Sequence, residues 1–297
     1  MKDENCDSET KMDGKIVIIT GANSGIGKET ARVLAERGAT IIMISRNKER
    51  GEAALKELKE KTGSDKIELI FADLTEPNTI HDAVDKFKAK YDHLDVLINN
   101  AGLTLNEREI TSIGYEKTFA TNHLGHFQLT QLLLDILKQS KPSRIVNVSS
   151  GVHPMANFKF HDINQKKHFR GYLAYANSKL ANLWFTYELA RKLEGTGVTV
   201  NALHPGFVRT NFGKRGRNWF LKSIFKFLRI FAISPEKGAK TSIYLASSPE
   251  LEGITGKYFE KCKPVKSSDA SYDLESQERL WQLSEHVFKT EEALLTH

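Results

Sequence analysis

Short apolar runs alternate with longer amphipathic stretches along most of the chain. The runs predict buried strands at 15–20, 40–44, 66–71, 94–98, 144–148 and 198–203. Helical periodicity fills the intervals at 26–37, 47–61, 78–91, 115–138 and 173–193. Strands and helices that alternate through short connections build a parallel sheet with helices on both faces. The sequence therefore predicts an α/β fold with a doubly wound, Rossmann-type sheet.

No linker or change of composition interrupts this pattern before about residue 206. A chain of 297 residues also suits one large α/β domain. We therefore expect a polar tail at 1–11 and a single domain at 12–297. The remaining predicted elements are helices at 237–246 and 277–287 and a strand at 257–259. In the 47–61 helix the expected core contacts are Ala53, Leu55 and Leu58.

The formal charge of +6 favours anionic partners in general, such as phosphorylated cofactors, acidic membranes or nucleic acids. The basic residues follow no nucleic-acid-binding module, so we expect no nucleic acid partner. The polar tail contains no apolar signal segment, and no uncharged apolar run reaches the roughly 18 residues of a spanning helix. These features predict a cytoplasmic protein.

The cysteine and histidine patterns indicate neither a disulfide framework nor a metal site. Cys6 and Cys262 belong to no CxxC pair, which fits a reducing compartment. The histidines with no zinc-ligand spacing are His123, His126, His161 and His204.

A glycine-rich turn, Thr20-Gly-Ala-Asn-Ser-Gly-Ile-Gly27, lies between the first predicted strand and the first predicted helix. Its glycines allow a tight turn, a close approach of the backbone to a pyrophosphate, and close helix–sheet packing. The helix N-terminus offers free N–H groups to phosphates. The turn therefore predicts a dinucleotide site, whose expected contacts are Gly21, Asn23, Ser24, Gly25, Ile26 and Gly27.

The end of the second strand indicates which dinucleotide is bound. NAD-binding folds usually place a carboxylate there for the ribose 2′-hydroxyl, whereas this chain has Ser45-Arg46-Asn47. A guanidinium pairs with a 2′-phosphate, which a carboxylate would repel. We therefore expect NADP(H) in preference to NAD(H), although Arg46 could simply open the next helix from a solvated position. Asp73, after the third strand, could reach the adenine edge.

Tyr175 and Lys179 lie four residues apart and therefore on one face of a predicted helix. An unperturbed tyrosine is a poor acid–base group at neutral pH. A neighbouring ammonium would lower its pKa and let the phenol exchange a proton with an alcohol or carbonyl oxygen. This spacing is common by chance, so the pair needs the support of its surroundings.

The surrounding motifs resemble those of the short-chain dehydrogenase/reductase family over nearly the whole chain. They follow the family's order: Thr20–Gly27, Asp73-Leu74, Asn99-Asn-Ala-Gly102, Asn122, Asn147-Val-Ser-Ser150, Tyr175 with Lys179, and His204-Pro-Gly206. The resemblance implies a nicotinamide cofactor. It implies further cofactor contacts at Leu74, Asn99, Ala101, Gly102, Tyr175, Lys179, Pro205 and Gly206.

The same resemblance implies catalytic roles for four residues. Tyr175 corresponds to the acid–base, and Lys179 to the residue that binds the nicotinamide ribose. Ser150 corresponds to the hydroxyl that holds the substrate oxygen, with Ser149 as the rival position. Asn122 corresponds to the residue that anchors a water in the proton relay.

Several segments narrow the resemblance to the retinol dehydrogenase subgroup. They include Phe160-His-Asp162, which lies in the 25-residue interval between Ser150 and Tyr175, and 178–185, 195–199 and 256–259. The subgroup favours NADP and interconverts retinal, retinol and other lipid-derived aldehydes and alcohols. Many of its members carry an N-terminal membrane anchor, where this sequence has a polar tail.

The segment 207–234 is expected to form a lid over the substrate. It is aromatic and aliphatic, which favours an apolar substrate, and Lys222, Lys226 and Arg229 fall on one helical face. That face either points to water or touches an anionic bilayer, and the second alternative would make the protein peripherally membrane-associated.

We therefore predict an NADP(H)-dependent oxidoreductase that interconverts apolar carbonyl compounds and alcohols. Two alternatives stay open: a steroid, quinone or xenobiotic carbonyl reductase, and a non-catalytic NADP-binding regulatory protein. A homo-oligomer is also open, since the family is often dimeric or tetrameric.

Overall fold

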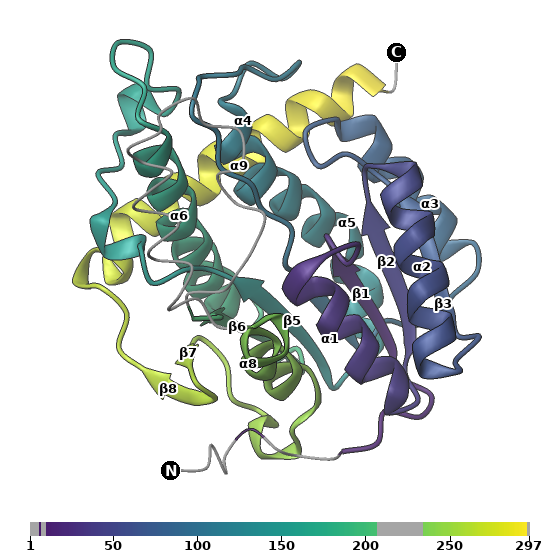
Figure 1. The fold of residues 1–297 in the computed structure, drawn as a ribbon. Coiled ribbons are helices and arrows are strands. Elements are labelled where there is room, and N and C mark those ends of the chain that lie inside the picture. Colours follow the sequence, from purple (N-terminus) through teal and green to yellow (C-terminus); the bar gives the residue numbers. More distant parts are fainter. Residues whose placement is uncertain (1–5, 7–9, 207–233, 296–297) are drawn as a thin grey trace.

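The sheet at the centre of the molecule has the order β3-β2-β1-β4-β5-β6-β7-β8 in the computed structural model, which describes residues 6, 10–206 and 234–295 (Figure 1). The strands are β1 Ile16–Thr20, β2 Thr40–Ser45, β3 Ile67–Phe71, β4 Val96–Asn99, β5 Ser143–Val148, β6 Val198–His204, β7 Tyr258–Glu260 and β8 Lys263–Val265. All neighbouring strands pair in parallel except β7 and β8. The predicted α/β, doubly wound sheet is confirmed.

Helices cover both faces of this sheet (Figure 1). They are α1 Gly25–Glu36, α2 Lys48–Thr62, α3 Pro77–Lys88, α4 Lys117–Phe119, α5 Gly125–Gln139, α6 Gly171–Lys192, α8 Pro235–Ser247 and α9 Leu274–Leu295. Apolar residues of α1, α2 and α8 build the core on one face, and those of α3, α5, α6 and α9 build it on the other. Val17 and Ile19 of β1 face the first core, while Ile16 and Ile18 face the second. Burial on both faces explains why the strands are continuous apolar runs.

Short helices complete the described elements. They are 3₁₀ turns at His153–Met155, Phe160–Asp162, Pro249–Leu251 and Asp269–Tyr272, and a π-helical turn at Ala120–Leu124. The π turn joins α4 to α5, so the single helix predicted at 115–138 is divided. Such turns are frequent at functional sites, and this one contains Asn122.

One sequence prediction about packing is wrong, and one strand was not predicted. Ala53 is exposed, and its neighbour Ala54 is buried together with Gly51 and Leu58. These three share the inward face of α2, whereas Ala53 lies one position beyond it. Strand β8 was also missed, because its three residues are exposed and Pro264 interrupts any apolar pattern.

A disulfide joins Cys6 to Cys262, with the two Cα atoms 5.6 Å apart. The expectation that the sequence contains no disulfide is therefore wrong. The cysteines are 256 residues apart in sequence, so local spacing gives no sign of their pairing. Met12 N donates to Arg37 O at the end of α1, and the Arg37 side chain donates to Ser247 at the end of α8. Cysteine usage consequently gives no support to a reducing compartment.

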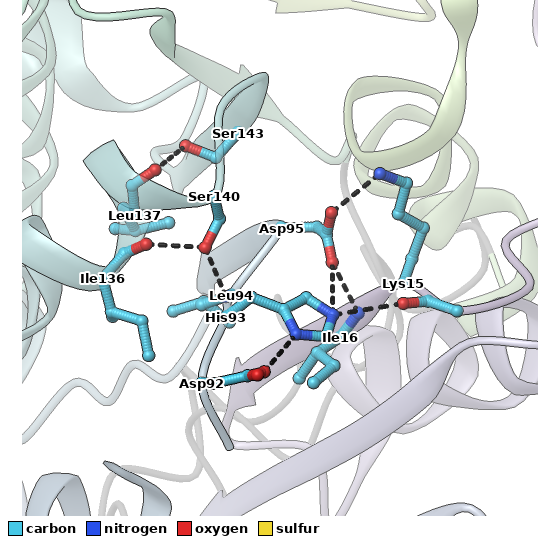
Figure 2. Close-up of polar contacts among 11 residues, drawn as sticks. Lys15, Ile16, Asp92, His93, Leu94, Asp95, Ile136, Leu137, Ser140 and Ser143 are labelled. Carbon is cyan, nitrogen blue, oxygen red and sulfur yellow. Dashed lines mark hydrogen bonds and ion pairs between the residues drawn. The ribbon is translucent and has the colours of Figure 1, made fainter.

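At the amino ends of β1 and β4, Asp95 fixes the two strands relative to each other (Figure 2). One carboxylate oxygen accepts a hydrogen bond from Ile16 N at 2.9 Å, and the other pairs with Lys15 Nζ at 2.8 Å. His93 lies beside Asp95, and its Nδ1 is 2.8 Å from an Asp92 oxygen. The amino ends are thus occupied by structural contacts, and the candidate site lies at the opposite edge of the sheet.

Candidate active site

The carboxyl ends of β1, β4, β5 and β6 meet at one edge of the sheet. The chain leaves β1 toward β2 and β3 on one side and continues from β4 on the other, so the edge between β1 and β4 is the switch point of the fold. In open α/β sheets such a switch point forms the ligand-binding crevice. The glycine-rich turn, the 99–102 loop, Ser150 and Gly206 all follow these strand ends.

The glycine-rich turn needs glycine at three positions, for two different reasons. Gly21 and Gly25 have φ angles of 68° and 57°, in the left-handed region that favours glycine. A Cβ on Gly27 would lie 2.4 Å from Asn100 Nδ2 and 2.7 Å from Gly21 O. The backbone of the turn is therefore in close contact with the 99–102 loop. A side chain at Gly27 would displace either the Asn100 side chain or the backbone at Gly21.

A hydrogen-bond network ties the turn to the π-helical segment. The Thr20 hydroxyl oxygen accepts from Asn100 N and Ala101 N, both at 2.9 Å. His126 Nδ1 lies 3.1 Å from the carbonyl of Asn122, which can only accept, so Nδ1 carries the proton. His126 Nε2 then accepts from the Thr20 hydroxyl at 2.8 Å. Burial lowers the pKa of His126 to about 4, which keeps this neutral tautomer.

A pocket of about 360 Å³ opens beside the turn. Its lining comprises Asn23, Ser24, Arg50, Ala53, Ala54 and Glu57. Asn23 and Ser24 are among the predicted cofactor contacts, and Arg50, which was not singled out from the sequence, lines the same pocket. Arg46 precedes the start of α2 at Lys48, so helical spacing does not relate it to Arg50.

Arg46 lies half-exposed after β2, with Nη1 3.8 Å from an Asp73 oxygen. The other Asp73 oxygen accepts from the backbone N and the hydroxyl of Thr75. The two residues predicted near the adenosine are thus adjacent. Leu74, the next predicted contact, is buried, and its carbonyl would lie 2.2 Å from a Cβ on Gly125.

Asn99 lies deeper than the other predicted cofactor contacts. It is buried, and its Nδ2 donates to Asn147 Oδ1 at 2.8 Å and to Thr130 at 3.0 Å. These bonds join β4, β5 and α5. Its neighbour Asn100 is the asparagine that contacts the glycine-rich turn, donating from Nδ2 to Thr20 O at 2.8 Å.

Tyr175 and Lys179 share one face of α6, as the spacing predicts. Lys179 Nζ lies 5.5 Å from the centre of the Tyr175 ring and donates to the carbonyl of Val148 at 2.9 Å. A Cβ on Gly102 would lie 3.5 Å from both Lys179 Nζ and Asn122 Oδ1. Four of the predicted site residues are therefore neighbours.

Burial has the largest influence on the titration of this pair. It raises the pKa of Tyr175 to about 12, and a hydrogen bond with the Ser150 side chain partly opposes the rise. Burial also lowers the pKa of Lys179 to about 7. The sequence led us to expect a lowered tyrosine pKa beside a full ammonium charge. In this structure Lys179 is only partly charged at neutral pH, and Tyr175 is a weak acid.

The two adjacent serines have different environments. Ser149 is buried, and its hydroxyl donates to the carbonyl of Lys179 at 2.8 Å. Ser150 is half-buried and contacts Tyr175. The hydroxyl nearer to the tyrosine is therefore that of Ser150.

Asn122 binds the loop that follows β4 with both ends of its side chain. Its Oδ1 accepts from Leu103 N at 2.8 Å, and its Nδ2 donates to Leu103 O and to the Ser178 hydroxyl, both at 2.9 Å. The side chain thus connects the π-helical turn, the 99–103 loop and α6.

The structure describes only part of the region where the substrate is expected, after β6. Pro205 and Gly206 follow β6, and Gly206 has a φ of 84°. The expected lid and its cationic face at 207–233 lie outside the described residues. The segment between Ser150 and Tyr175 packs through Phe158 and Phe160 on Trp184 of α6, with ring centres 5.1 and 5.9 Å away.

The described part of the chain comprises residues 6, 10–206 and 234–295. Within these ranges no three or more His, Cys, Asp or Glu residues are grouped to hold a metal ion. Within the same ranges no helix is both long and apolar enough to cross a bilayer.

Comparison with known proteins places this geometry in a family. Residues 15–220 match the family model for short chain dehydrogenases. The chain is 41% identical over 279 residues to mouse retinol dehydrogenase 12, covering 94% of this chain and 88% of the relative. It is 43% identical over 289 residues to human retinol dehydrogenase 14, covering 92% and 86% respectively.

Solved structures agree on the fold. An uncharacterised protein from Mycobacterium paratuberculosis superimposes with a TM-score of 0.76 at 34% identity, covering 94% of this chain and 95% of that protein. A short chain dehydrogenase from Escherichia coli CFT073, solved in complex with NADPH, superimposes with a TM-score of 0.65 at 24% identity, covering 86% of this chain and 100% of that protein. From the family match and these relatives, the chain belongs to the short-chain dehydrogenase family, as an oxidoreductase related to the retinol dehydrogenases.

Proposed function

We propose that this protein, acting as a single domain, is an NADP(H)-dependent oxidoreductase that interconverts apolar aldehydes or ketones with their alcohols. The observation that supports this most is the arrangement of Ser150, Tyr175 and Lys179. Two side-chain oxygens are in hydrogen-bond contact beside a buried amine, at the switch point of the sheet. That arrangement can polarise a carbonyl oxygen and give it a proton.

The glycine-rich turn suits a dinucleotide because side chains at Gly21 and Gly27 would be strained or would collide with the 99–102 loop. The Ser24 side chain makes no capping hydrogen bond at the start of α1, which leaves the helix N-terminus to a phosphate. We assign pyrophosphate binding to the turn and nicotinamide binding to Lys179, Pro205 and Gly206. A bound NADPH would supply the hydride for the carbonyl carbon.

Ser150 would hold the carbonyl oxygen, and Tyr175 would deliver its phenolic proton to that oxygen. The raised pKa of Tyr175 keeps the phenol protonated at neutral pH, as reduction requires. Lys179 would contact the nicotinamide ribose and, when protonated, stabilise the phenolate that remains. Asn122 would anchor a water that restores the proton.

Arg46 and Arg50 are our candidates for the 2′-phosphate. Arg46 is half-exposed, and Arg50 lines the pocket next to Asn23 and Ser24. A guanidinium binds a phosphate bidentately, so both would favour NADP(H) over NAD(H). Asp73 would lie at the adenine edge.

The relation to retinol dehydrogenases favours a retinoid-like or other lipid-derived substrate. A steroid, quinone or xenobiotic carbonyl is the alternative substrate. A non-catalytic NADP-binding role is the alternative function. Cytoplasmic location, peripheral membrane contact and a homo-oligomer stay predictions.

A substrate panel tests the proposal. NADPH absorbance is followed with all-trans-retinal, a medium-chain aldehyde and a cyclic ketone, and each reaction is repeated with NADH. Faster loss of absorbance with retinal or the aldehyde than with the ketone, and with NADPH than with NADH, supports the proposed class. Turnover of the ketone alone favours the alternative substrates. NADPH binding without any turnover favours the non-catalytic role.

A further inference from the structure

The imidazole of His153 lies between the Ser150 loop and the segment after β8. Nδ1 is 2.8 Å from the carbonyl oxygen of Ser150, and Nε2 is 3.0 Å from the backbone N of Ser268. Ser150 and Ser268 are 118 positions apart in the sequence. One buried side chain thus connects two distant segments.

These two partners allow only one form of the ring. A carbonyl can only accept a hydrogen bond and a backbone N–H can only donate one. Nδ1 must therefore carry the proton, and Nε2 must be the bare acceptor. A protonated ring would place a second N–H against the Ser268 N–H and break that bond.

The surroundings of His153 favour this neutral form. The residue is 4% exposed, and its ring packs edge-on against Tyr258 of β7 at 5.2 Å. The histidine that interacts electrostatically with His153 is His204 at the end of β6, whose Nδ1 accepts from Gly151 N at 3.0 Å. The negative charge of Glu260 of β7 opposes the lowering of the His204 pKa that burial causes. Burial lowers the pKa of His153.

On the serine side, the Ser150 carbonyl receives two donors from one residue. His153 N donates to it at 3.2 Å in addition to Nδ1. Val152 N lies 3.4 Å from the Ser150 hydroxyl. The 150–153 turn is therefore closed around the serine by its own backbone and by the imidazole.

On the other side, the segment that holds Ser268 is attached to α6. The Tyr187 and Ser267 hydroxyls are 2.6 Å apart, and Trp184 Nε1 donates to Ala270 O at 2.8 Å. Helix α6 also carries Tyr175. The chain of contacts from Ser150 through His153 and Ser268 therefore returns to the helix of the tyrosine.

We propose that His153 is a positioning residue, which sets the Ser150 hydroxyl relative to Tyr175 by fixing the serine loop to the 267–270 segment. The inference rests on the proposed function, because it assigns His153 a role through Ser150. Both of its ring nitrogens are bonded to backbone groups, so it would act on the reaction through Ser150.

The structure offers a matched pair of variants at Ser268. Its φ of −62° is compatible with proline, so Ser268→Pro removes the N–H donor without forcing a new φ, and the proline ring carbon that replaces the hydrogen displaces the imidazole. The Ser268 hydroxyl has no hydrogen-bond partner among the described residues, so Ser268→Ala keeps the donor and loses no side-chain bond. His153→Ala removes both contacts, and His153→Asn retains a donor near the position of Nδ1.

The test measures all-trans-retinal reduction by NADPH, with Ser150→Ala as the reference. We expect kcat to fall about ten- to a hundredfold in His153→Ala and Ser268→Pro, with the NADPH KM unchanged. Ser268→Ala should match the wild type, and His153→Asn should exceed His153→Ala. The His153→Ala, Ser268→Pro double variant should be no slower than the slower single variant.

A second readout separates positioning from a general loss of stability. In the alcohol-oxidation direction, the apparent pKa of Tyr175 should rise in His153→Ala, since the Ser150 hydrogen bond that lowers it is weakened. The same shift should appear in Ser150→Ala and not in Ser268→Ala. Far-ultraviolet circular dichroism and NADPH binding identify any variant that is not folded.

The outcomes distinguish this inference from the proposed function. If Ser150→Ala lowers kcat but His153→Ala and Ser268→Pro do not, the inference is overturned and the function stands. If Ser150→Ala leaves kcat unchanged, the proposed serine role fails and the inference with it. If the wild type turns over no carbonyl, the proposed function fails. In that case ¹⁵N spectra of the His153 ring test the hydrogen bond between His153 Nε2 and Ser268 N. An Nδ1–H tautomer that persists in Ser268→Ala but not in Ser268→Pro supports the contact, and rapid tautomer exchange in the wild type overturns it.

Discussion

Lys179 Nζ donates a 2.9 Å hydrogen bond to the carbonyl of Val148, two residues before Ser150. The bond joins α6 to the end of β5 and holds the amine away from water. Within residues 6, 10–206 and 234–295 no carboxylate forms an ion pair with Lys179, and burial lowers the pKa of Lys179 to about 7. The site therefore contains a lysine that is costly to bury in its charged form.

Replacement of this lysine should stabilise the protein while it removes activity. The pKa of Lys179 is lower in the folded than in the unfolded protein, so stability is lost as pH falls from about 10.5 toward 7. Lys179→Met removes that cost, and Asn182 Nδ2 still donates to the Val148 carbonyl at 3.2 Å. We expect the free energy of unfolding to rise by about 1–3 kcal/mol at pH 7, and retinal turnover to fall at least about a hundredfold. Thermal unfolding across pH 7–10 without NADPH measures the first effect, and a lower Tm in the variant would contradict the account.

Cofactor preference should depend on both arginines near the turn. Arg46→Ala and Arg50→Ala each remove a candidate phosphate contact, so the NADPH KM should rise about ten- to a hundredfold. The NADH KM should change little, because NADH has no 2′-phosphate. Steady-state kinetics with both cofactors make the comparison. An equal loss for NADH would instead indicate a general disturbance of the pocket.

The cluster of His93, Asp92 and Asp95 at the amino ends of β1 and β4 should make the stability of the protein depend slightly on pH (Figure 2). The hydrogen bond with Asp92 is the main cause of a raised His93 pKa. The stabilisation of the folded protein by protonated His93 is therefore complete below pH 6.5, and it is lost as pH rises through the pKa of His93 in the folded state. His93 is 42% exposed, so solvent screening limits the effect to under about 0.5 kcal/mol.

His93→Gln tests this by chemical unfolding at pH 6 and pH 8. The wild type should lose slightly more stability than the variant between the two values. Turnover should be unaffected, since the cluster lies at the edge of the sheet opposite the site. A variant with the wild-type pH dependence would exclude His93 as its source.

Reduction of the Cys6–Cys262 disulfide should lower stability, because the link closes a loop across 256 residues of the unfolded chain. We expect a loss of about 2–4 kcal/mol, measured as a fall in Tm on addition of a reductant. Cys6→Ser should reproduce the lower Tm and be insensitive to the reductant. An unchanged wild-type Tm after complete reduction would contradict the prediction.

The sequence was sufficient to predict the main sheet and the edge of the sheet at which the candidate site residues gather. Both depend on local signals: apolar runs mark buried strands, and functional residues follow strand ends. The spacing of Tyr175 and Lys179 needs only helical geometry, and the two residues do lie together.

What could not be predicted depends on contacts between distant segments. Cys6 and Cys262, and likewise His153 and Ser268, are far apart in sequence and are brought together by the tertiary fold. The rise in the pKa of Tyr175 is a consequence of burial, which residue spacing does not reveal. Arg50 faces a pocket with Asn23 and Ser24 that periodicity alone does not define.

The central claim is that Tyr175 delivers the proton during carbonyl reduction, and Tyr175→Phe tests it most directly. The measurement is NADPH oxidation with the best carbonyl substrate, together with NADPH binding by fluorescence. The account predicts a loss of kcat of at least about a hundredfold with NADPH binding retained. Turnover within a few fold of the wild type would contradict it.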